Sequence, residues 1–228
     1  MVLLEVTNIK KIYSTRFGGN KVQALSNVTF SVEEGEFVAI MGESGSGKTT
    51  LLEETIRRLK AKRPIYVIEG DQQTSNDADR IAALEIPVFQ VNTGTGCHLE
   101  ADMVNHAVKH LNPKEGAILF IENVGNLVCP AEFDTGAVKN AMILSVPEGH
   151  DKPLKYPLMF SICDVVLINK IDVMPYFDFD LEQCKKNILM RNPNAKIIPI
   201  CAKTGEGMEE WADWLKKETA AWREEEHA

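Results

Sequence analysis

Long apolar runs are missing from this sequence of 228 residues. Polar or charged residues interrupt every hydrophobic stretch before it reaches the roughly 18 residues that a membrane-spanning helix needs. The five cysteines have no regular spacing and do not indicate a disulfide framework. Acidic residues outnumber basic ones by 33 to 25. The resulting formal net charge of −8 argues against nucleic acid or an anionic membrane as a general partner. We expect no signal peptide, because Glu5 and Lys10 soon follow Met1, and we therefore expect a cytoplasmic protein.

The length and a hydrophobic content of 44% suit one α/β domain with a small appendage. From Leu51 onward, short apolar stretches alternate with helical patterns, which is typical of a mainly parallel sheet covered by helices on both faces. Strands of this sheet are expected at residues 37–41, 65–69, 88–92, 117–121, 142–146, 165–168 and 196–200. Helices are expected at residues 50–62, 76–84, 100–111, 154–162, 180–191 and 207–222. Ligands of such sheets bind at the carboxyl ends of the strands.

The first 35 residues follow a different pattern. Residues 3–13 and 22–32 are rich in β-forming side chains and are joined by a turn that contains glycine. Two strands with a short connection predict an antiparallel β-hairpin and not a βαβ unit. We therefore expect residues 1–35 to form a β appendage of the same compact domain that residues 36–228 build.

A phosphate-binding loop of the G-x-x-x-x-G-K-[ST] type occupies residues 42–49, between strand 37–41 and a helical stretch. Its glycines allow the tight turn that points N–H groups at phosphate oxygens, and the following helix adds its positive dipole end. Lys48 would reach the β- and γ-phosphates, and the Thr49 hydroxyl would ligate Mg²⁺. The predicted cradle comprises Gly42, Ser44, Gly45, Ser46, Gly47, Lys48, Thr49 and Thr50.

Asn169-Lys-Ile-Asp172 follows the strand at 165–168 and indicates guanine recognition. The Asp172 carboxylate can accept two hydrogen bonds from guanine, whereas adenine would leave it unpaired at a cost of about 1–3 kcal/mol. Asn169 would read the base edge, and the Lys170 stem would pack over the base. Cys201-Ala202-Lys203, at the end of the next strand, stands where GTPases often have Ser-Ala-Lys. These motifs predict GTP or GDP as the ligand of a P-loop GTPase domain over residues 36–228.

Candidate catalytic residues follow two further strands. Glu122 is placed for an outer-sphere contact to Mg²⁺, and the N–H of Gly125 for sensing the γ-phosphate. Asp71 is a second candidate, either for Mg²⁺ or for the attacking water. Gln72, Gln73 and Thr74 beside it could belong to a switch segment, and the sequence leaves open which of these residues acts.

Cys97, His98 and Cys129 also follow strands and could meet at one edge of the sheet. Thiolates with imidazole suit Zn²⁺ or Ni²⁺, although buried cysteines are more often small hydrophobic residues. One chain supplies only three ligands, so a site shared by two protomers is the more complete arrangement. Cys163, Cys184 and Cys201 are expected to be buried hydrophobic residues, and His106 and His110 to face solvent or to hold a second ion.

Residues from about 51 to 214 resemble the HypB family, the GTPases that assist nickel insertion into [NiFe] hydrogenases. The resemblance is carried by residues 69–71, 92–94, 97–99, 120–134, 151–157, 169–172 and 202–205, of which the segment 120–134 is the most specific. It implies a GTP-dependent homodimer that shares a metal site made by Cys97, His98 and Cys129, and a metallochaperone or hydrogenase partner. It also implies that Lys152 and Lys155 approach the nucleotide across the dimer. Asp102, where many relatives have His, puts a second metal with His106 in doubt.

The first fifty residues instead resemble the start of ABC-transporter ATPase domains, in which Tyr13 would stack on adenine. No Leu-Ser-Gly-Gly-Gln signature follows, and the strand that ends at Ile121 lacks the Asp-Glu pair. The two resemblances meet within the P-loop, which suggests a chimera, engineered or recombined at that point.

The leading hypothesis is therefore a Mg²⁺-dependent protein that binds GTP, hydrolyses it slowly and handles nickel. One alternative is an ATP-binding module of ABC type with Tyr13 as the base platform, since an aromatic face accepts either purine. Another is a nucleotide-binding scaffold with little activity, because GTP turnover needs switch loops next to the replaced segment.

Overall fold

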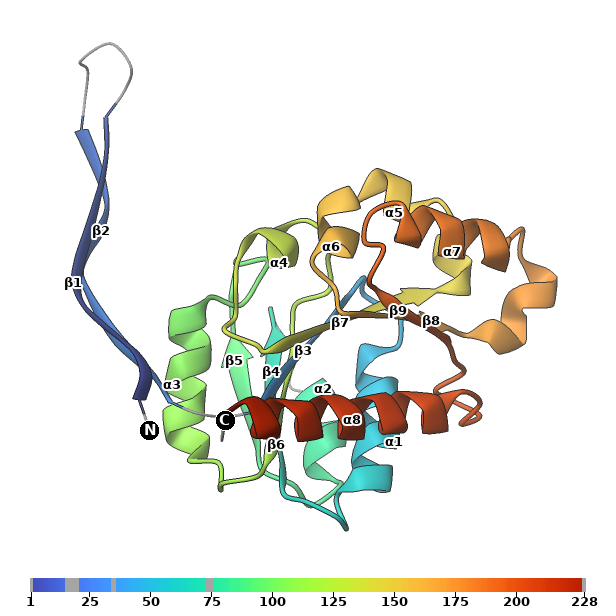
Figure 1. Cartoon of the computed structure of the whole chain (residues 1–228), viewed down its shortest axis with the longest axis horizontal. Coiled ribbons are helices and arrows are strands. Elements are labelled where there is room, and N and C mark those ends of the chain that lie inside the picture. The colour runs from blue at the N-terminus through green and yellow to red at the C-terminus, as the bar shows by residue number, and fades with distance from the viewer. Residues whose placement is uncertain (1, 15–20, 34–35, 73–75, 227–228) are drawn as a thin grey trace. The chain divides into compact units, whose positions relative to one another are not determined.

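The computed structural model describes residues 2–14, 21–33, 36–72 and 76–226 (Figure 1). The chain divides into two compact units, Met1–Gly35 and Glu36–Ala228, which we describe separately. No helix among the described residues is long and apolar enough to cross a membrane.

The first unit consists of two paired strands. β1 (Val2–Ser14) pairs antiparallel with β2 (Lys21–Glu33), and the register places Tyr13 opposite Val22. Register shifts interrupt the ladder at several points. The predicted antiparallel hairpin is therefore present, while its turn and the Tyr13 side chain lie outside what the structure describes. Whether this unit belongs to one compact domain with the rest stays a prediction.

The second unit contains a seven-stranded sheet in the order β5-β4-β6-β3-β7-β8-β9. Every neighbouring pair in it is parallel, which confirms the predicted sheet type. Its strands are β3 (Glu36–Gly42), β4 (Ile65–Asp71), β5 (Val88–Asn92), β6 (Ile118–Glu122), β7 (Lys139–Ser145), β8 (Val165–Asn169) and β9 (Lys196–Pro199). The P-loop strand β3 lies between β6 and β7, so the carboxyl ends of both neighbours flank the phosphate loop.

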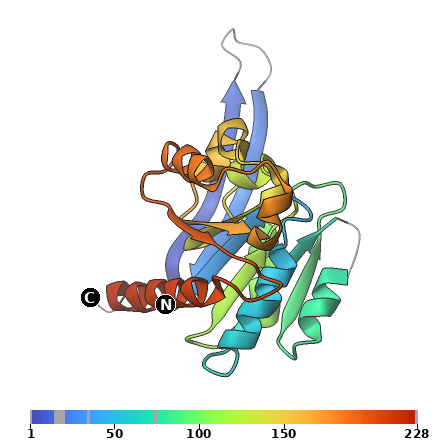
Figure 2. The ribbon, with the colours of Figure 1, turned by 90° about the vertical axis from the view of Figure 1, so that its right-hand side faces the viewer.

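Helices follow the strands and cover both faces of this sheet. They are α1 (Lys48–Leu59), α2 (Asn76–Ala82), α3 (Ala101–Leu111), α4 (Cys129–Glu132), α5 (Lys152–Lys155), α6 (Pro157–Ser161), α7 (Leu181–Leu189) and α8 (Met208–Glu226). Two 3₁₀ turns, η1 (Val146–Glu148) and η2 (Ile171–Tyr176), complete the unit. The strands lie between layers of helices in Figures 1 and 2.

The prediction of one continuous helix at residues 154–162 is wrong. The structure has two short helices there, α5 and α6, and Tyr156 between them has φ −124° and ψ 59°. Pro157 explains the break, because proline has no backbone N–H to donate and disfavours the helical conformation of the residue before it.

Alternate residues along β4 and β6 belong to separate hydrophobic clusters on the two faces of the sheet. Val67 and Phe120 join the cluster beneath α1, α2 and α8, whereas Ile68 and Ile121 pack against α3 on the other face. A third cluster joins β7 and β8 to α6 and α7 and contains Phe160. The sheet is thus buried on both sides, and its carboxyl edge is left to carry polar side chains.

Candidate nucleotide and metal sites

The phosphate loop connects the end of β3 to the start of α1. Ser46 N donates to Glu43 O at 3.2 Å, which closes the turn, and Lys48 Nζ donates to the same carbonyl at 3.3 Å. Gly47 has φ 101°, and a Cβ added there would collide with Asn169 Nδ2. Glycine is therefore required at position 47 both by its backbone conformation and by the close approach of Asn169.

Asn169 joins the phosphate loop to the second predicted base-binding loop. Its Nδ2 donates to Ser46 O at 2.8 Å, and its Oδ1 accepts the N–H of Ala202 at 3.1 Å. The side chain is 3% exposed, so both of these bonds are shielded from water. Lys170, in the left-handed region at φ 63°, donates from Nζ to Gly45 O at 2.7 Å. The structure thus brings the Asn-Lys-x-Asp segment onto the P-loop.

Asp172 and Cys201 also lie together. The Cys201 thiol donates to Asp172 Oδ1 at 3.2 Å, and Cys201 itself is buried. Asp172 is exposed, so its carboxylate is accessible to a ligand while the thiol fixes its direction. Lys203 is exposed as well.

Three carboxylates meet beside Thr49 at the start of α1, and two of them, Glu69 and Glu122, are buried. Thr49 Oγ1 donates to Glu122 Oε1 at 3.0 Å, and oxygens of Glu69, Asp77 and Glu122 lie within 4.8 Å of one another. Burial, followed by repulsion from Glu122 and Asp77, raises the pKa of Glu69. Burial also raises the pKa of Glu122, while the nearby charge of Lys48 opposes that rise.

Two of these carboxylate oxygens, Oε2 of Glu69 and Oε2 of Glu122, are buried without a hydrogen-bond partner among the described residues. Orphaned acceptors in an acidic cluster beside a threonine hydroxyl are a donor set that suits Mg²⁺. Sequence reasoning named Thr49 and Glu122 but missed Glu69 and Asp77. The signal lay in the sheet register, since Glu69 is the direct neighbour of Glu122 between β4 and β6.

Asp71 lies outside that carboxylate cluster. Its Oδ1 accepts the N–H of Gln72 at 2.6 Å, and its carbonyl accepts the N–H of Thr93 at 2.9 Å. Gln72 Nε2 donates to Gly96 O at 3.0 Å. The proposed switch residues Gln73 and Thr74 fall outside the described residues. A role of Asp71 in holding Mg²⁺ or the attacking water stays a prediction.

Gly125 lies against the phosphate loop. A Cβ at this position would be 2.8 Å from the backbone nitrogen of Ser44. The loop after β6 therefore approaches the phosphate loop more closely than any side chain would allow. Thr50, at the first turn of α1, accepts a hydrogen bond from Arg80 Nη2 at 3.3 Å.

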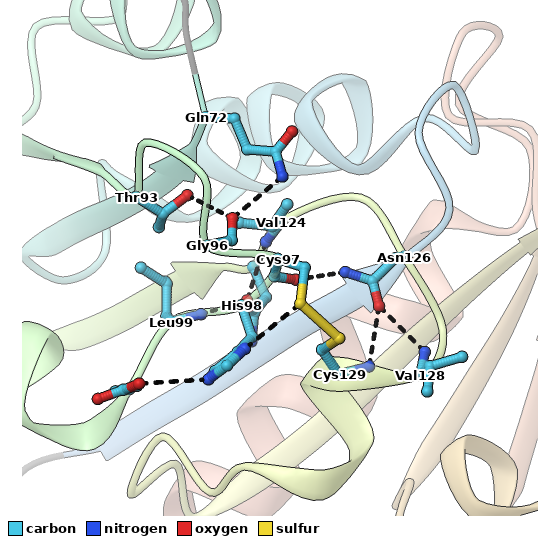
Figure 3. The surroundings of a disulfide bond; sticks show 12 residues. Gln72, Thr93, Gly96, Cys97, His98, Leu99, Val124, Asn126, Val128 and Cys129 are labelled. Carbon is cyan, nitrogen blue, oxygen red and sulfur yellow. Dashed lines mark hydrogen bonds and ion pairs between the residues drawn. A yellow bond between two sulfur atoms is a disulfide. The ribbon is translucent and has the colours of Figure 1, made fainter.

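The predicted metal ligands Cys97, His98 and Cys129 come together (Figure 3). Cys97 and Cys129 are joined by a disulfide with a Cα–Cα distance of 6.1 Å. The cysteine spacing indicated no disulfide, and this pairing corrects that expectation: the two cysteines are 32 residues apart and meet only through the fold. His98 Nδ1 is 3.7 Å from Cys97 Sγ, and its ring stacks on Phe133 at a centroid distance of 3.8 Å.

Asn126 ties the two cysteine loops together, and sequence reasoning missed it. Its Nδ2 donates to the carbonyl of Cys97, while its Oδ1 accepts the N–H groups of Val128 and Cys129 at 3.0 Å each (Figure 3). His98 Nε2 is buried, has no hydrogen bond to any residue that the structure describes, and lies 3.6 Å from Glu100 Oε1. Once the disulfide is reduced, two sulfurs and an imidazole nitrogen would converge within one ion's reach.

Two further cysteines and two histidines, Cys163, Cys184, His106 and His110, do not join this set. Cys163 and Cys184 are buried, and burial raises the pKa of the Cys184 thiol to about 12. His106 and His110 are exposed and contact the ring of Phe89. Asp102, at the start of α3, is also exposed.

Comparisons with known proteins identify the family of this chain. The family model "CobW/HypB/UreG, nucleotide-binding domain" matches residues 36–199. The chain is 53% identical to the hydrogenase maturation factor HypB of Azotobacter vinelandii over 78% of this chain and 59% of that protein. It is 49% identical to HypB of Escherichia coli K12 over 89% of this chain and 70% of that protein. The chain thus spans about 60% of the length of the Azotobacter relatives.

A crystal structure of HypB from Helicobacter pylori in complex with nickel has a TM-score of 0.77 to this chain at 39% identity, with 82% of this chain and 88% of that chain covered. The Escherichia coli match is longer than residues 36–228 alone, so it extends into the first 35 residues. The interpretation of residues 1–50 as the start of an ABC-transporter ATPase, and hence of a chimera, is not supported by these matches. The chain belongs to the HypB branch of the CobW/HypB/UreG family of nucleotide-binding domains.

Proposed function

We propose that this protein binds and slowly hydrolyses GTP with Mg²⁺ and that it handles nickel during hydrogenase maturation. The observation that carries the proposal is the double attachment of Asn169 to Ser46 and Ala202, which sets the base-recognition segment beside the phosphate loop. The names of the HypB relatives, and the nickel in the Helicobacter pylori structure, support the second half of the proposal.

Guanine would be recognised by Asp172, whose carboxylate is accessible and oriented by the Cys201 thiol. Guanine offers it two N–H donors, and adenine offers none at these positions, so adenine leaves the carboxylate unpaired. Lys170 bonds to Gly45 and would lie against one face of the base with its aliphatic stem.

Hydrolysis would take place between the phosphate loop and the loop after β6. Lys48, now bonded to Glu43 O, would turn to the β- and γ-phosphates, and the N–H of Gly125 would meet the γ-phosphate. Thr49 and Glu122 would hold Mg²⁺, and the carboxylates of Glu69 and Asp77 lie close to Glu122. The ion would supply positive charge that offsets the charge developing on the phosphates.

Nickel or zinc would bind as cargo to Cys97, His98 and Cys129 after reduction of the disulfide. Three donors from one chain leave a coordination position open, and a homodimer that faces two such sets would fill it. A hydrogenase or a metallochaperone would then be the partner in metal transfer. Exposed apolar side chains beside this set, Val128 and Phe133, support a protein contact at this surface.

The experiment that tests this function is calorimetric titration of the full chain with GDP, GTP, ADP and ATP, each with Mg²⁺. We expect guanine nucleotides to bind and adenine nucleotides to bind at least 100-fold more weakly, about 2.7 kcal/mol. Asp172→Asn should lose this preference, whereas the matched exposed variant Asp178→Asn should keep it. Equal binding of ATP and GTP by the unaltered chain would contradict the proposal.

The same titration, together with a phosphate-release assay, separates the two alternatives. Tight ATP binding that Tyr13→Ala removes would favour an ABC-type base platform and with it the chimera. Selective GTP binding with no hydrolysis above that of Lys48→Ala would instead describe a nucleotide-binding scaffold of little activity.

A further inference from the structure

The phosphate loop carries a carboxylate of its own. Glu43 follows Gly42 directly, and its carbonyl accepts hydrogen bonds from Ser46 N and Lys48 Nζ, so its backbone forms part of the phosphate cradle. Its side chain is 30% exposed and therefore only partly screened by water. An ionised carboxylate at this position repels the polyphosphate that the loop is built to hold.

Lys152 on α5 pairs with that carboxylate within the same chain. Its Nζ forms an ion pair with Glu43 Oε1, and it lies 5.2 Å from the centroid of the Tyr156 ring. The Lys152 side chain is only 14% exposed, so this cation is held at the loop and is not a mobile surface lysine. The family resemblance implies that Lys152 approaches the nucleotide of a second copy, whereas here its ion-pair partner lies in the phosphate loop of the same chain.

A second carboxylate, Glu148, anchors the turn that precedes this lysine. Glu148 Oε1 accepts from Ser145 N at 2.8 Å and from Ser145 Oγ at 2.7 Å, which anchors the turn that leads from β7 to α5. The charges of Glu43 and Lys152 both act on Glu148. Lys152 therefore pairs with Glu43 and also interacts electrostatically with Glu148, at the carboxyl edge of the sheet.

We infer that Lys152 is a positioning residue that neutralises Glu43 in cis and so makes the phosphate loop able to accept a polyphosphate. The inference rests on the proposed nucleotide function and adds the residue pair that sets the charge of its phosphate subsite. The effect of Lys152 should grow with the charge of the ligand, because the repulsion from Glu43 scales with the number of phosphates.

The test is a double-mutant cycle with Glu43→Gln, Lys152→Gln and the double variant, titrated with GMP, GDP and a non-hydrolysable GTP analogue in Mg²⁺. We expect Lys152→Gln to weaken binding of the GTP analogue about tenfold and binding of GMP far less, by Coulomb repulsion across the partly screened loop. Glu43→Gln should bind at least as tightly as the unaltered chain. The double variant should return to within about threefold of it, since the unpaired carboxylate is gone.

Lys216→Gln is the matched control, since it removes one positive charge from an exposed pair with Asp213 on α8. A double variant as weak as Lys152→Gln would overturn the inference and would mean that Lys152 contacts the nucleotide directly or across a dimer. The same loss for all three ligands, accompanied by a lowered melting temperature, would also overturn it in favour of a structural role. If the unaltered chain prefers ATP, the proposed guanine function fails while the cycle can still be run with adenine nucleotides. Absence of binding by the unaltered chain would overturn both.

Discussion

The Thr49 hydroxyl donates a hydrogen bond of 3.0 Å to Glu122, and this bond joins the start of α1 to the end of β6. Both residues are buried, Thr49 at 7% and Glu122 at 3% exposure. The pair holds a hydroxyl and a carboxylate next to each other at the end of the phosphate loop. Such an arrangement is ready to receive a hard cation without a large rearrangement.

Glu122→Gln should raise the Mg²⁺ concentration needed for half-maximal GTP hydrolysis about 10- to 100-fold, because the neutral amide no longer supports the ion. The measurement is phosphate release against Mg²⁺ concentration. Glu182→Gln, an exposed residue on α7, is the control and should leave the curve unchanged. An unaltered Mg²⁺ dependence in Glu122→Gln would place the ion elsewhere, with Asp71 as the next candidate.

The raised pKa of Glu69 predicts how stability changes with pH in the absence of Mg²⁺. Its usual value is 4.5, so the folded state binds the proton more tightly than the unfolded state. The stabilisation is fully present below that value and is lost as pH rises above it, by at most about 1.4 kcal/mol per pH unit for this one proton. Urea denaturation at pH 5, 6 and 7 should show a falling free energy of unfolding. Glu69→Gln should flatten this dependence, and an equally steep slope in that variant would refute the assignment.

Metal binding should depend on the redox state of Cys97 and Cys129. With the disulfide formed, neither Cys97 nor Cys129 can supply a thiolate, so titration with Ni²⁺ or Zn²⁺ should show the site only after reduction. Thiolate-to-nickel charge-transfer absorption would report it directly. Cys129→Ser should abolish the absorption, and Cys163→Ser, at a buried thiol away from the site, should keep it. Absorption of equal strength before reduction would show that these sulfurs are not the ligands.

Asn126→Ala should weaken metal binding about tenfold while leaving nucleotide affinity unchanged, because this side chain orients both cysteine loops without belonging to the nucleotide site. Metal and GDP titrations on the same reduced sample provide the two measurements. Asn194→Ala, at an exposed turn, is the control. A parallel loss of GDP affinity would mean that the substitution disturbs the loop after β6 as a whole.

Trp211→Phe should lower the free energy of unfolding by about 1–3 kcal/mol. The Trp211 indole is fully buried, and its Nε1 donates to Thr55 Oγ1 at 2.9 Å, which fastens α8 to α1. Chemical denaturation gives the value. Trp214 is half-buried and stacks on Trp211, so Trp214→Phe should lower the free energy of unfolding by less. An equal loss in the two variants would show that the hydrogen bond to Thr55 is not the cause.

The parallel sheet could be predicted from the sequence, because short apolar stretches alternate with helical patterns. The two nucleotide motifs could be recognised because a glycine-rich loop after a strand and an Asn-Lys-x-Asp segment are local patterns. It was insufficient for Glu69, since the meeting of Glu69 with Glu122 depends on the register of strands that are far apart in the chain. Asn126 was missed for a similar reason. Its three hydrogen bonds reach across two loops, and an asparagine in a loop has no distinctive pattern.

The central position of β3 has a consequence for the order in which this protein can be made. The Asn169–Ser46 bond spans 123 residues, and β3 needs both β6 and β7 as neighbours. Long-range parallel pairing is slow, and a chain emerging from the ribosome cannot close this bond before residue 169 has left the exit tunnel. Nucleotide therefore cannot guide the early steps of folding. It can protect the chain only after most of the sheet has been assembled.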